Sequence, residues 1–414
     1  MSRNVIVVGG GICGLAASIY LARNGVTVTL FERERHLGGR ATTQLRNGFR
    51  FNLGPHRVLR RGAGARIFRE LGVPLRGGRP RAAGTALSGG ERYRLPVSPL
   101  SLTFTRLLSP AAKLEAARLM FRIRRIDPAP FAGITIREWL DANVSDARLR
   151  LTFDAVLRAA TYSSDPDQSA APALQQLKLA NQGFAYIDEG WQKIVDALHS
   201  HSVSAGVNFV TSSQVLRVIY DDSVRAVELG GLQDEPKGTR LAADTVLLAV
   251  DPVTAGQIVG NAELSRSWRE LRPVTAACLG VALSKLPDRR RPIVVDIDRP
   301  LYLAVHSVFA QLTPHGGALV QAVKFGSGDG AEQELESLMD ELQPGWRDLV
   351  VNRRFLPSTV VSNALATPKT PRPRPATSVR GLYIAGDWVE AEGLLADAAL
   401  SSAKSAAEAI LRTP

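Results

Sequence analysis

The sequence contains few of the residues from which disulfide scaffolds, cysteine-based metal sites and membrane spans are built. Only two of its 414 residues are cysteine, Cys13 and Cys278, and they lie far apart with no CxxC pair. This excludes a disulfide scaffold and a zinc site made of cysteines, and it favours a reducing compartment. No stretch reaches the roughly 18 apolar residues that a membrane-spanning helix requires.

Lysine is scarce as well, because only eight of the 51 basic residues are lysine and the arginines are scattered along the chain. The formal net charge is nevertheless +12. No basic run alternates with aromatic side chains and no nucleic-acid motif is present, so we expect no nucleic-acid partner, although a basic surface favours anionic lipid. The apolar stretch from Val5 to Leu21 contains three consecutive glycines and no cleavage site, so we expect a cytoplasmic protein that touches membranes at most peripherally.

Missing motifs exclude several enzyme classes. The sequence has no GxSxG elbow, Walker loop or HExxH pair, which leaves hydrolase, NTPase and zinc-protease functions without residues. His199 and His201 alternate near a helix end, a spacing that rarely places two histidines on one metal, so we expect no metal site. Gly326, Gly328 and Ala331 have GxGxxA spacing, but acidic residues surround them and favour a plain turn over a second nucleotide site.

The first 32 residues have the pattern of a strand, a glycine-rich turn, a helix and a second strand. An apolar β-branched run ends at Val8, and Gly9, Gly11 and Gly14 follow in GxGxxG spacing. The first glycine permits the turn, the second lets a pyrophosphate approach the backbone, and the third lets helix and strand pack closely. The second strand ends in Glu32, whose carboxylate is placed to accept hydrogen bonds from ribose hydroxyls. These elements predict a dinucleotide site.

A second glycine pair follows at Gly38 and Gly39, with Arg40 next to it. With this motif the segments GGGICGLAAS and FERERHLGGRAT resemble the FAD-binding start of the amine oxidase and phytoene desaturase superfamily, which includes hydroxysqualene dehydroxylases and protoporphyrinogen oxidases. The resemblance implies FAD as the cofactor and contact of Arg40 with its phosphates, with Gly39 and Arg33 also among the cofactor contacts.

The C-terminal segment GLYIAGDWVEAEGLLADAALSSAK resembles the closing FAD motif of the same superfamily. Gly386 and Asp387 follow a buried strand and are expected to turn toward the cofactor, where Asp387 bonds a ribityl or phosphate-side group or only caps the loop. A helix beginning at Leu395 and Ala396 would direct its backbone amides at the flavin, where hydride transfer leaves negative charge. The resemblance also places the backbone of Val215 against the adenine.

These segments imply an α/β fold with a Rossmann-like FAD-binding domain of the glutathione-reductase type. The hydrophobic content of 45% and charged content of 22% are those of a globular chain of two to three domains. We expect the FAD-binding domain to comprise three segments, 1–77, 184–261 and 376–414. The two insertions are expected to form an α+β substrate-binding domain, mostly helical over 78–183 and a mixed sheet over 262–375.

The resemblance places Gly54, Pro55 and His56 beside the flavin. His56 is the candidate catalytic residue, as a proton donor or acceptor or as a hydrogen-bond partner of the substrate, with a purely structural role as the alternative. Amine oxidases of the superfamily often have a lysine that positions water at the flavin, and Lys285 is the nearest match, although its charged surroundings favour a solvated role. Trp388 occupies a position that one residue of an amine-oxidase aromatic cage could take, without a clear partner.

The expected function is that of an FAD-dependent oxidoreductase that removes hydride from a mostly apolar carbon substrate and forms or relocates a double bond. Electrons are expected to pass to oxygen, a quinone or a partner protein. Oxidation of an amine is the alternative reaction, and a flavin-binding scaffold without turnover is the alternative of another class. The segment SPAAKLEAARLMFRIRR mixes apolar side chains with arginines, so a helix there either rests on a membrane surface or packs its apolar side into the core.

Overall fold

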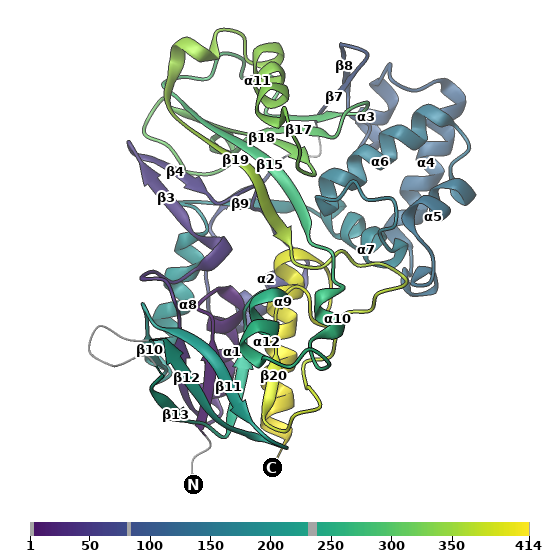
Figure 1. Cartoon of the computed structure of the whole chain (residues 1–414). Coiled ribbons are helices and arrows are strands. Elements are labelled where there is room, and N and C mark those ends of the chain that lie inside the picture. The colour runs from purple at the N-terminus through teal and green to yellow at the C-terminus, as the bar shows by residue number, and fades with distance from the viewer. Residues whose placement is uncertain (1–3, 81–83, 231–237, 414) are drawn as a thin grey trace.

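The computed structural model describes residues 4–80, 84–230 and 238–413. Figure 1 shows two lobes, each built around a sheet, with both chain ends at the tip of the lower lobe. The predicted α/β fold is confirmed. Among the described residues, no helix is both long and apolar enough to cross a bilayer.

The lower lobe contains a five-stranded parallel sheet. Its strands form in short apolar runs rich in β-branched residues, which suit a sheet covered on both faces. They stand in the order β10-β2-β1-β14-β20 and all neighbouring pairs are parallel. Three widely separated stretches of the chain supply them: β1 (Asn4–Val8), β2 (Thr27–Phe31), β10 (Asn208–Val210), β14 (Thr245–Leu248) and β20 (Leu382–Ile384).

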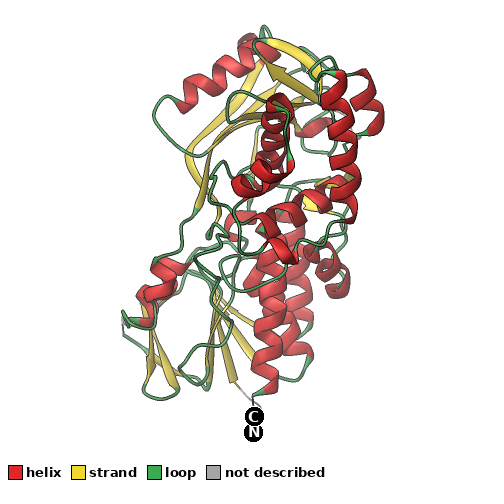
Figure 2. Cartoon of the chain, turned by 90° about the vertical axis from the view of Figure 1, so that its right-hand side faces the viewer, coloured by secondary structure: helices red, strands yellow, loops and turns green. Residues whose placement is uncertain are grey.

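Each face of this sheet is covered by a different layer. Helices pack on one face, and Figure 2 shows helices beside the strands of this lobe. They are α1 (Ile12–Arg23), α2 (Ala63–Leu71), α8 (Gln192–Ser204) and α12 (Leu395–Arg412). An antiparallel sheet and two short helices cover the other face: β11 (Gln214–Tyr220), β12 (Val224–Gly230), β13 (Arg240–Ala242), α9 (Pro252–Val259) and α10 (Arg266–Arg269). Helices on one face and a small sheet on the other leave the carboxyl ends of the parallel strands open toward the upper lobe.

The upper lobe contains a seven-stranded sheet in the order β19-β15-β18-β17-β16-β7-β8. Six strand pairings give this order, of which only β16 with β7 is parallel. The strands are β7 (Thr85–Ser88), β8 (Glu91–Arg94), β15 (Val274–Leu283), β16 (Ile293–Asp296), β17 (Leu301–Val305), β18 (Ala318–Phe325) and β19 (Val350–Ser362). The stretch predicted as mostly helical therefore also contributes two strands to the sheet of the second insertion.

Helices cover both faces of the upper sheet. The acidic helix α11 (Ala331–Leu342) packs on one face through its buried leucines. A helical cluster packs on the other: α3 (Pro99–Phe104), α4 (Pro110–Arg125), α5 (Ile136–Asn143), α6 (Ala147–Thr161) and α7 (Ala170–Asn181). Polar caps set several of these helix starts, including the expected capping box of Thr135 and Glu138.

Short elements connect the two lobes. The strands β3 (Thr43–Arg46) and β4 (Phe49–Asn52) form a hairpin directly after Gly39 and Arg40. Strand β9 (Phe184–Ile187) then pairs with both β5 (Val58–Leu59) and β6 (Gly77–Gly78). The 3-10 helices are η1 (Gly39–Ala41), η2 (Ala129–Phe131), η3 (His306–Val308) and η4 (Trp346–Leu349).

Candidate functional site

A large cavity lies where the carboxyl ends of the parallel strands meet the upper lobe. Its volume is about 640 Å³, within the range of roughly 300 to 1,000 Å³ typical of small-molecule and cofactor sites. Ligands of open α/β sheets bind at this strand edge. Of the predicted cofactor and catalytic residues, all but Gly14 and Gly54 line it: Gly9, Gly11, Glu32, Arg33, Gly39, Arg40, Pro55, His56, Val215, Gly386, Asp387, Leu395 and Ala396.

The glycines of the first turn form a cradle for an anion. Gly9 has a φ of +109°, and a Cβ atom added to Gly14 would lie 2.0 Å from the Gly9 carbonyl oxygen, so the third glycine serves close packing. Gly11 caps α1 without a side-chain hydrogen bond, and a Cβ atom there would meet open space. Gly39 lies opposite, where its Cβ would approach the Gly11 Cα at 3.7 Å. Uncapped backbone amides at a helix N-terminus favour a phosphate.

Glu32 ends β2 at one end of the cavity. Its carboxylate accepts hydrogen bonds from the backbone amides of Gly10, at 2.7 Å, and Glu34, at 2.9 Å. Each carboxylate oxygen retains acceptor capacity, as a ribose diol requires. The neighbouring Arg33 is exposed and pairs with Glu34 at 3.3 Å. Val215, which begins a bulged part of β11, lines the same end of the cavity.

Arg40 and Asp387 form a two-pronged ion pair that joins the first and last parts of the chain. Their atoms lie 2.9 and 3.0 Å apart, and Asn363 donates two further hydrogen bonds to Asp387, at 2.8 and 3.1 Å. Burial disfavours the charge of Asp387, but Arg40 and Asn363 outweigh it and hold the pKa of this carboxyl below its ordinary value. The carboxylate therefore stays ionised, and Arg40 is held in a fixed position at the cavity wall.

The N-terminus of α12 also opens to the cavity. Leu395 has a φ of +57°, which is strained for a branched residue, and neither it nor the N-cap Leu394 satisfies the free amides of the first turn. Leu395, Ala396 and Ala399 line the cavity. Strain at such a position marks functional sites, and the exposed amides favour negative charge in front of the helix.

His56 lines the cavity between the glycine-rich turn and the upper lobe. Its Nδ1 lies 3.0 Å from the carbonyl oxygen of Gly54, which has a φ of +119°, so Gly54 positions the ring from behind. The ring also contacts Trp191, with centroids 5.0 Å apart. Burial, with a contribution from Arg40, lowers the pKa of His56 against the opposing hydrogen bond to Gly54, so the imidazole is neutral near pH 7.

Sequence reasoning missed several residues of the cavity wall. Asp251 caps α9 by accepting from the Thr254 amide at 2.9 Å, and the DPVT sequence carries this capping signal. Arg57 and Tyr162 form the wall beside His56, and residues 359–361 of β19 contribute from the upper lobe. No local pattern marks these residues, because distant pairing brings them to the cavity.

Two residues considered for amine oxidation lie elsewhere. Lys285 is exposed just beyond the end of β15 that points away from the cavity, whereas Pro273, before the other end, lines it. A ten-residue strand spans about 33 Å. Trp388 does not line the cavity, because its fully buried ring packs 5.5 Å from Trp268 and its Nε1 donates to the Val250 carbonyl at 2.8 Å. It lies in the core behind the strand edge.

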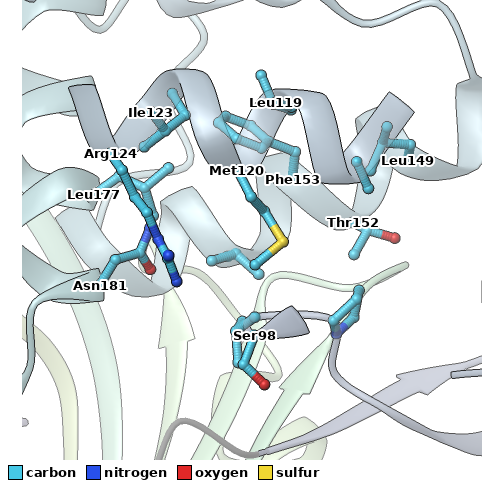
Figure 3. Close-up of a pocket in the computed structure, with 14 residues that line it drawn as sticks. Ser98, Leu119, Met120, Ile123, Arg124, Leu149, Thr152, Phe153, Leu177 and Asn181 are labelled. Atoms are coloured by element: carbon cyan, nitrogen blue, oxygen red, sulfur yellow. The ribbon is translucent and has the colours of Figure 1, made fainter. Parts of the chain in front are cut away.

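The other candidates set aside in the sequence also lie away from the cavity. His199 contacts Phe209, and His201 bonds the Gly72 carbonyl oxygen at 3.2 Å. The GxGxxA stretch connects β18 to α11. Figure 3 shows a second, smaller cavity among α4, α6 and α7, whose volume of about 110 Å³ is less than the roughly 150 Å³ that holds benzene in a protein core. It is too small for an extended substrate in this conformation.

Comparison with known proteins supports the same cofactor as the residues of the cavity. The family model of flavin containing amine oxidoreductases matches residues 12–411. An oxidoreductase from Methanosarcina mazei has the same fold, with a TM-score of 0.77 at 18% identity over 98% of this chain and all of that one. Putrescine oxidase bound to putrescine has a TM-score of 0.70 at 17% identity over 99% of both chains.

A local sequence match points to a different relative. A stretch of 55 residues is 42% identical to 4,4'-diaponeurosporene oxygenase of Staphylococcus aureus, and it spans 13% of this chain and 11% of that protein. This match is too short to assign an activity. The family model covers nearly the whole chain, and the cavity has a glycine-rich turn, the Glu32 carboxylate and an open helix N-terminus, which suit FAD. The chain belongs to the flavin-containing amine oxidoreductase family and is an FAD-dependent oxidoreductase.

Proposed function

We propose that the enzyme removes a hydride from a mostly apolar carbon substrate and forms or relocates a carbon–carbon double bond. Bound FAD supplies the hydride acceptor. The relatives leave the bond type open, because one is named for the oxygenation of diaponeurosporene and another binds putrescine, a diamine. The charges of the cavity wall favour the carbon substrate.

The carboxylates of the cavity wall are all engaged, and this observation carries the proposal. Glu32 accepts from two backbone amides, Glu34 pairs with Arg33, Asp251 caps α9, and Asp387 pairs with Arg40. A protonated amine needs a free carboxylate or an aromatic cage to replace its hydration. The wall around His56 instead contains the guanidinium of Arg57, which repels an ammonium group and already lies over the Tyr162 ring. An ammonium group is therefore disfavoured there.

His56 is proposed to accept the proton that leaves with the hydride. Its Nδ1 lies 3.0 Å from the Gly54 carbonyl oxygen, so we assign the hydrogen of the neutral ring to Nδ1, which leaves the lone pair on Nε2. A neutral imidazole is the form that accepts a proton, and the lowered pKa keeps it neutral. Loss of a hydride from one carbon and of a proton from its neighbour leaves the double bond, which balances the reaction.

Anaerobic reduction of the bound flavin tests this proposal. Holoenzyme is mixed without oxygen with a linear polyene such as neurosporene in detergent, and separately with putrescine and spermidine. We expect the visible absorbance of the oxidised flavin to bleach with the polyene and to remain with the amines. Bleaching by the amines alone would support the amine oxidase instead, and a flavin that none of these compounds reduces would favour the scaffold.

We also propose that α3 and α4 contact anionic membranes, where an apolar substrate would reside. The sequence left open whether the apolar side chains of α4 face a membrane or the core. In the structure Leu119 and Ile123 are buried, while Leu114 and Phe121 are 56% and 60% exposed. On α3, Leu100 and Phe104 are 68% and 59% exposed. We call this set, together with the exposed arginines of α4, the α3–α4 surface: Leu100, Phe104, Leu114, Phe121, Arg118, Arg122, Arg124 and Arg125.

The composition of the α3–α4 surface fits an anionic bilayer better than a protein partner. The Arg125 guanidinium lies 3.8 Å from the centre of the Phe121 ring, so charge and apolar area alternate along one exposed face. Apolar side chains that enter the lipid boundary and arginines that bind anionic head groups act together in interfacial helices. The exposed Leu151 and Leu411 on other helices also have arginines next to them in the sequence, but those arginines pair with carboxylates: Arg148, Arg150 and Arg412.

A further inference from the structure

The structure contains a partly buried cation, Arg57, that the proposed reaction does not use. Arg57 lines the cavity next to His56 and forms no ion pair with any described residue. Removing part of a guanidinium from water is costly, so a partly buried arginine usually has partners for the N–H groups that water no longer reaches. An unpaired guanidinium in a cavity wall therefore needs either a structural partner or a ligand.

Structural partners account for only part of the Arg57 guanidinium. Its Nη2 donates to the carbonyl oxygens of Ala159 and Ala160, at 2.5 and 2.9 Å, at the C-terminal end of α6. Its Nε is buried without a partner. No described residue accepts a hydrogen bond from Nη1, so two of the five N–H groups are satisfied by the protein. A purely structural arginine would satisfy more of them.

The surroundings of Arg57 hold it in place without neutralising its charge. The guanidinium carbon lies 5.0 Å from the Tyr162 ring centre and 4.9 Å from that of Phe184. Burial raises the pKa of Tyr162, and of Tyr186 and Tyr302 nearby, so these phenols are neutral. His306 is neutral too, because burial, then His56 and Arg57, lower its pKa to about 3. The α6 carbonyl oxygens and the faces of the two rings stabilise the cation, but no formal negative charge balances it.

We propose that Arg57 is a specificity-determining residue that binds a carboxylate carried by the otherwise apolar substrate. One guanidinium with free N–H groups matches one carboxylate, whereas a phosphate dianion would leave negative charge unpaired among aromatic rings. The aromatic rings beside it provide contact for the apolar part of the same molecule. This inference rests on the proposed function, because it names the substrate class of that reaction as an apolar acid.

Calorimetric titration of the holoenzyme with three ten-carbon probes tests this site. Decanoate, decan-1-ol and decylamine have the same apolar chain and differ only in the end group. We expect decanoate to bind about 10- to 100-fold more tightly than decanol, the range for a hydrogen bond to a charged group in a desolvated site, and decylamine to bind most weakly. Equal affinities for decanoate and decanol, or tighter binding of decylamine, would overturn the assignment.

Three variants attribute the preference to this side chain. Arg57→Met is expected to bind decanoate and decanol equally, and Arg57→Lys to retain part of the preference. Arg60→Gln is the matched control, because it removes the same charge from an exposed residue three positions along and leaves the preference unchanged. A preference that survives in a folded Arg57→Met would refute the inference. Where Arg57→Met fails to retain FAD, Arg57→Lys decides, because an unchanged preference for decanoate in this variant would also refute the inference.

The outcome is independent of the flavin-reduction experiment. Binding of decanoate is measured without turnover, so it can fail while a polyene still bleaches the flavin, in which case the proposed reaction stands without an acidic substrate. Tight decanoate binding together with a flavin that no polyene reduces would support the carboxylate site and refute the proposed reaction. The two results therefore separate the site from the chemistry.

Discussion

Replacing Asp397 by asparagine should stabilise the protein at neutral and alkaline pH and not at acid pH. Asp397 lies in the first turn of α12 and is 5% exposed. Its Oδ1 accepts a hydrogen bond from the Gly64 amide at 2.8 Å, which satisfies the otherwise uncapped start of α2, while its Oδ2 is buried without a partner. Burial is the main cause that raises the pKa of this carboxyl, from 3.8 to about 6.

The pKa of Asp397 sets the size and sign of this effect. A pKa rise of about two units means that ionising this carboxyl costs roughly 3 kcal/mol more in the folded protein than in the unfolded one. The positive end of the α12 dipole stabilises the carboxylate and reduces this cost by about a few tenths to 1 kcal/mol. Because the folded-state pKa is higher than the unfolded one, the protonated form is favoured in the folded protein. The stabilisation is complete below pH 3.8 and is lost as the pH rises to about 6. Ionised Asp397 therefore destabilises the protein at pH 8.

Asparagine removes this penalty because it stays neutral and keeps an oxygen to accept from Gly64. We expect Asp397→Asn to raise the free energy of unfolding by about 2 to 3 kcal/mol at pH 8, or the thermal midpoint by about 3 °C for a chain of this length. At pH 4 the two proteins should be equally stable. Calorimetric scans between pH 4 and 8 with saturating FAD measure the difference.

The control is Asp146→Asn at the N-cap of α6, where Asp146 accepts from the Leu149 amide at 2.8 Å. Asparagine and aspartate cap helices about equally well, so little change is expected there at any pH. A stability difference for Asp397→Asn that does not vary with pH, or a loss of stability at pH 8, would refute the reasoning about burial.

Three further predictions concern the cofactor, the lysine and the membrane. Glu32→Gln should weaken FAD binding about 10-fold, since a neutral amide accepts ribose hydrogen bonds less well, and fluorescence of released flavin measures this. Unchanged affinity would contradict the ribose role. Lys285→Met should leave substrate-driven flavin reduction within about twofold of wild type, because the residue lies about 33 Å along β15 from the cavity end; a large loss would restore the lysine role. Leu114→Ser with Phe121→Ser should reduce sedimentation with anionic vesicles about 10-fold, whereas the exposed Val203→Ser should not; equal binding by all variants would exclude the α3–α4 surface.

The parts of the site that sequence predicts best are those whose geometry is local. Gly9, Gly11, Gly14 and Glu32 lie within one strand–turn–helix–strand unit, and their spacing fixes their positions relative to each other. The same holds for the start of α12, where a small-residue helix follows a buried strand. Local spacing therefore places both ends of the cofactor cavity.

Contacts between distant parts of the chain could not be predicted in this way. The Arg40–Asp387 pair spans 347 positions and the Gly64–Asp397 bond spans 333. In the sequence, Arg40 is explained as a phosphate contact and Asp397 as an acidic residue in the first turn of a helix. Only the folded chain shows the partner of each. The position of Trp388 could not be predicted for the same reason, since the sequence does not show whether a side chain after a strand end points into the cavity or into the core.

The central claim is that three distant stretches of this chain hold one FAD in a single cavity. The most direct measurement is the flavin released on denaturation of the purified protein after incubation with FAD and removal of the excess, identified by chromatography and compared with the protein concentration. We predict one FAD per chain, and a reduced yield for an Asp387→Ala variant that loses the partner of Arg40. A colourless protein that retains no FAD would contradict the account.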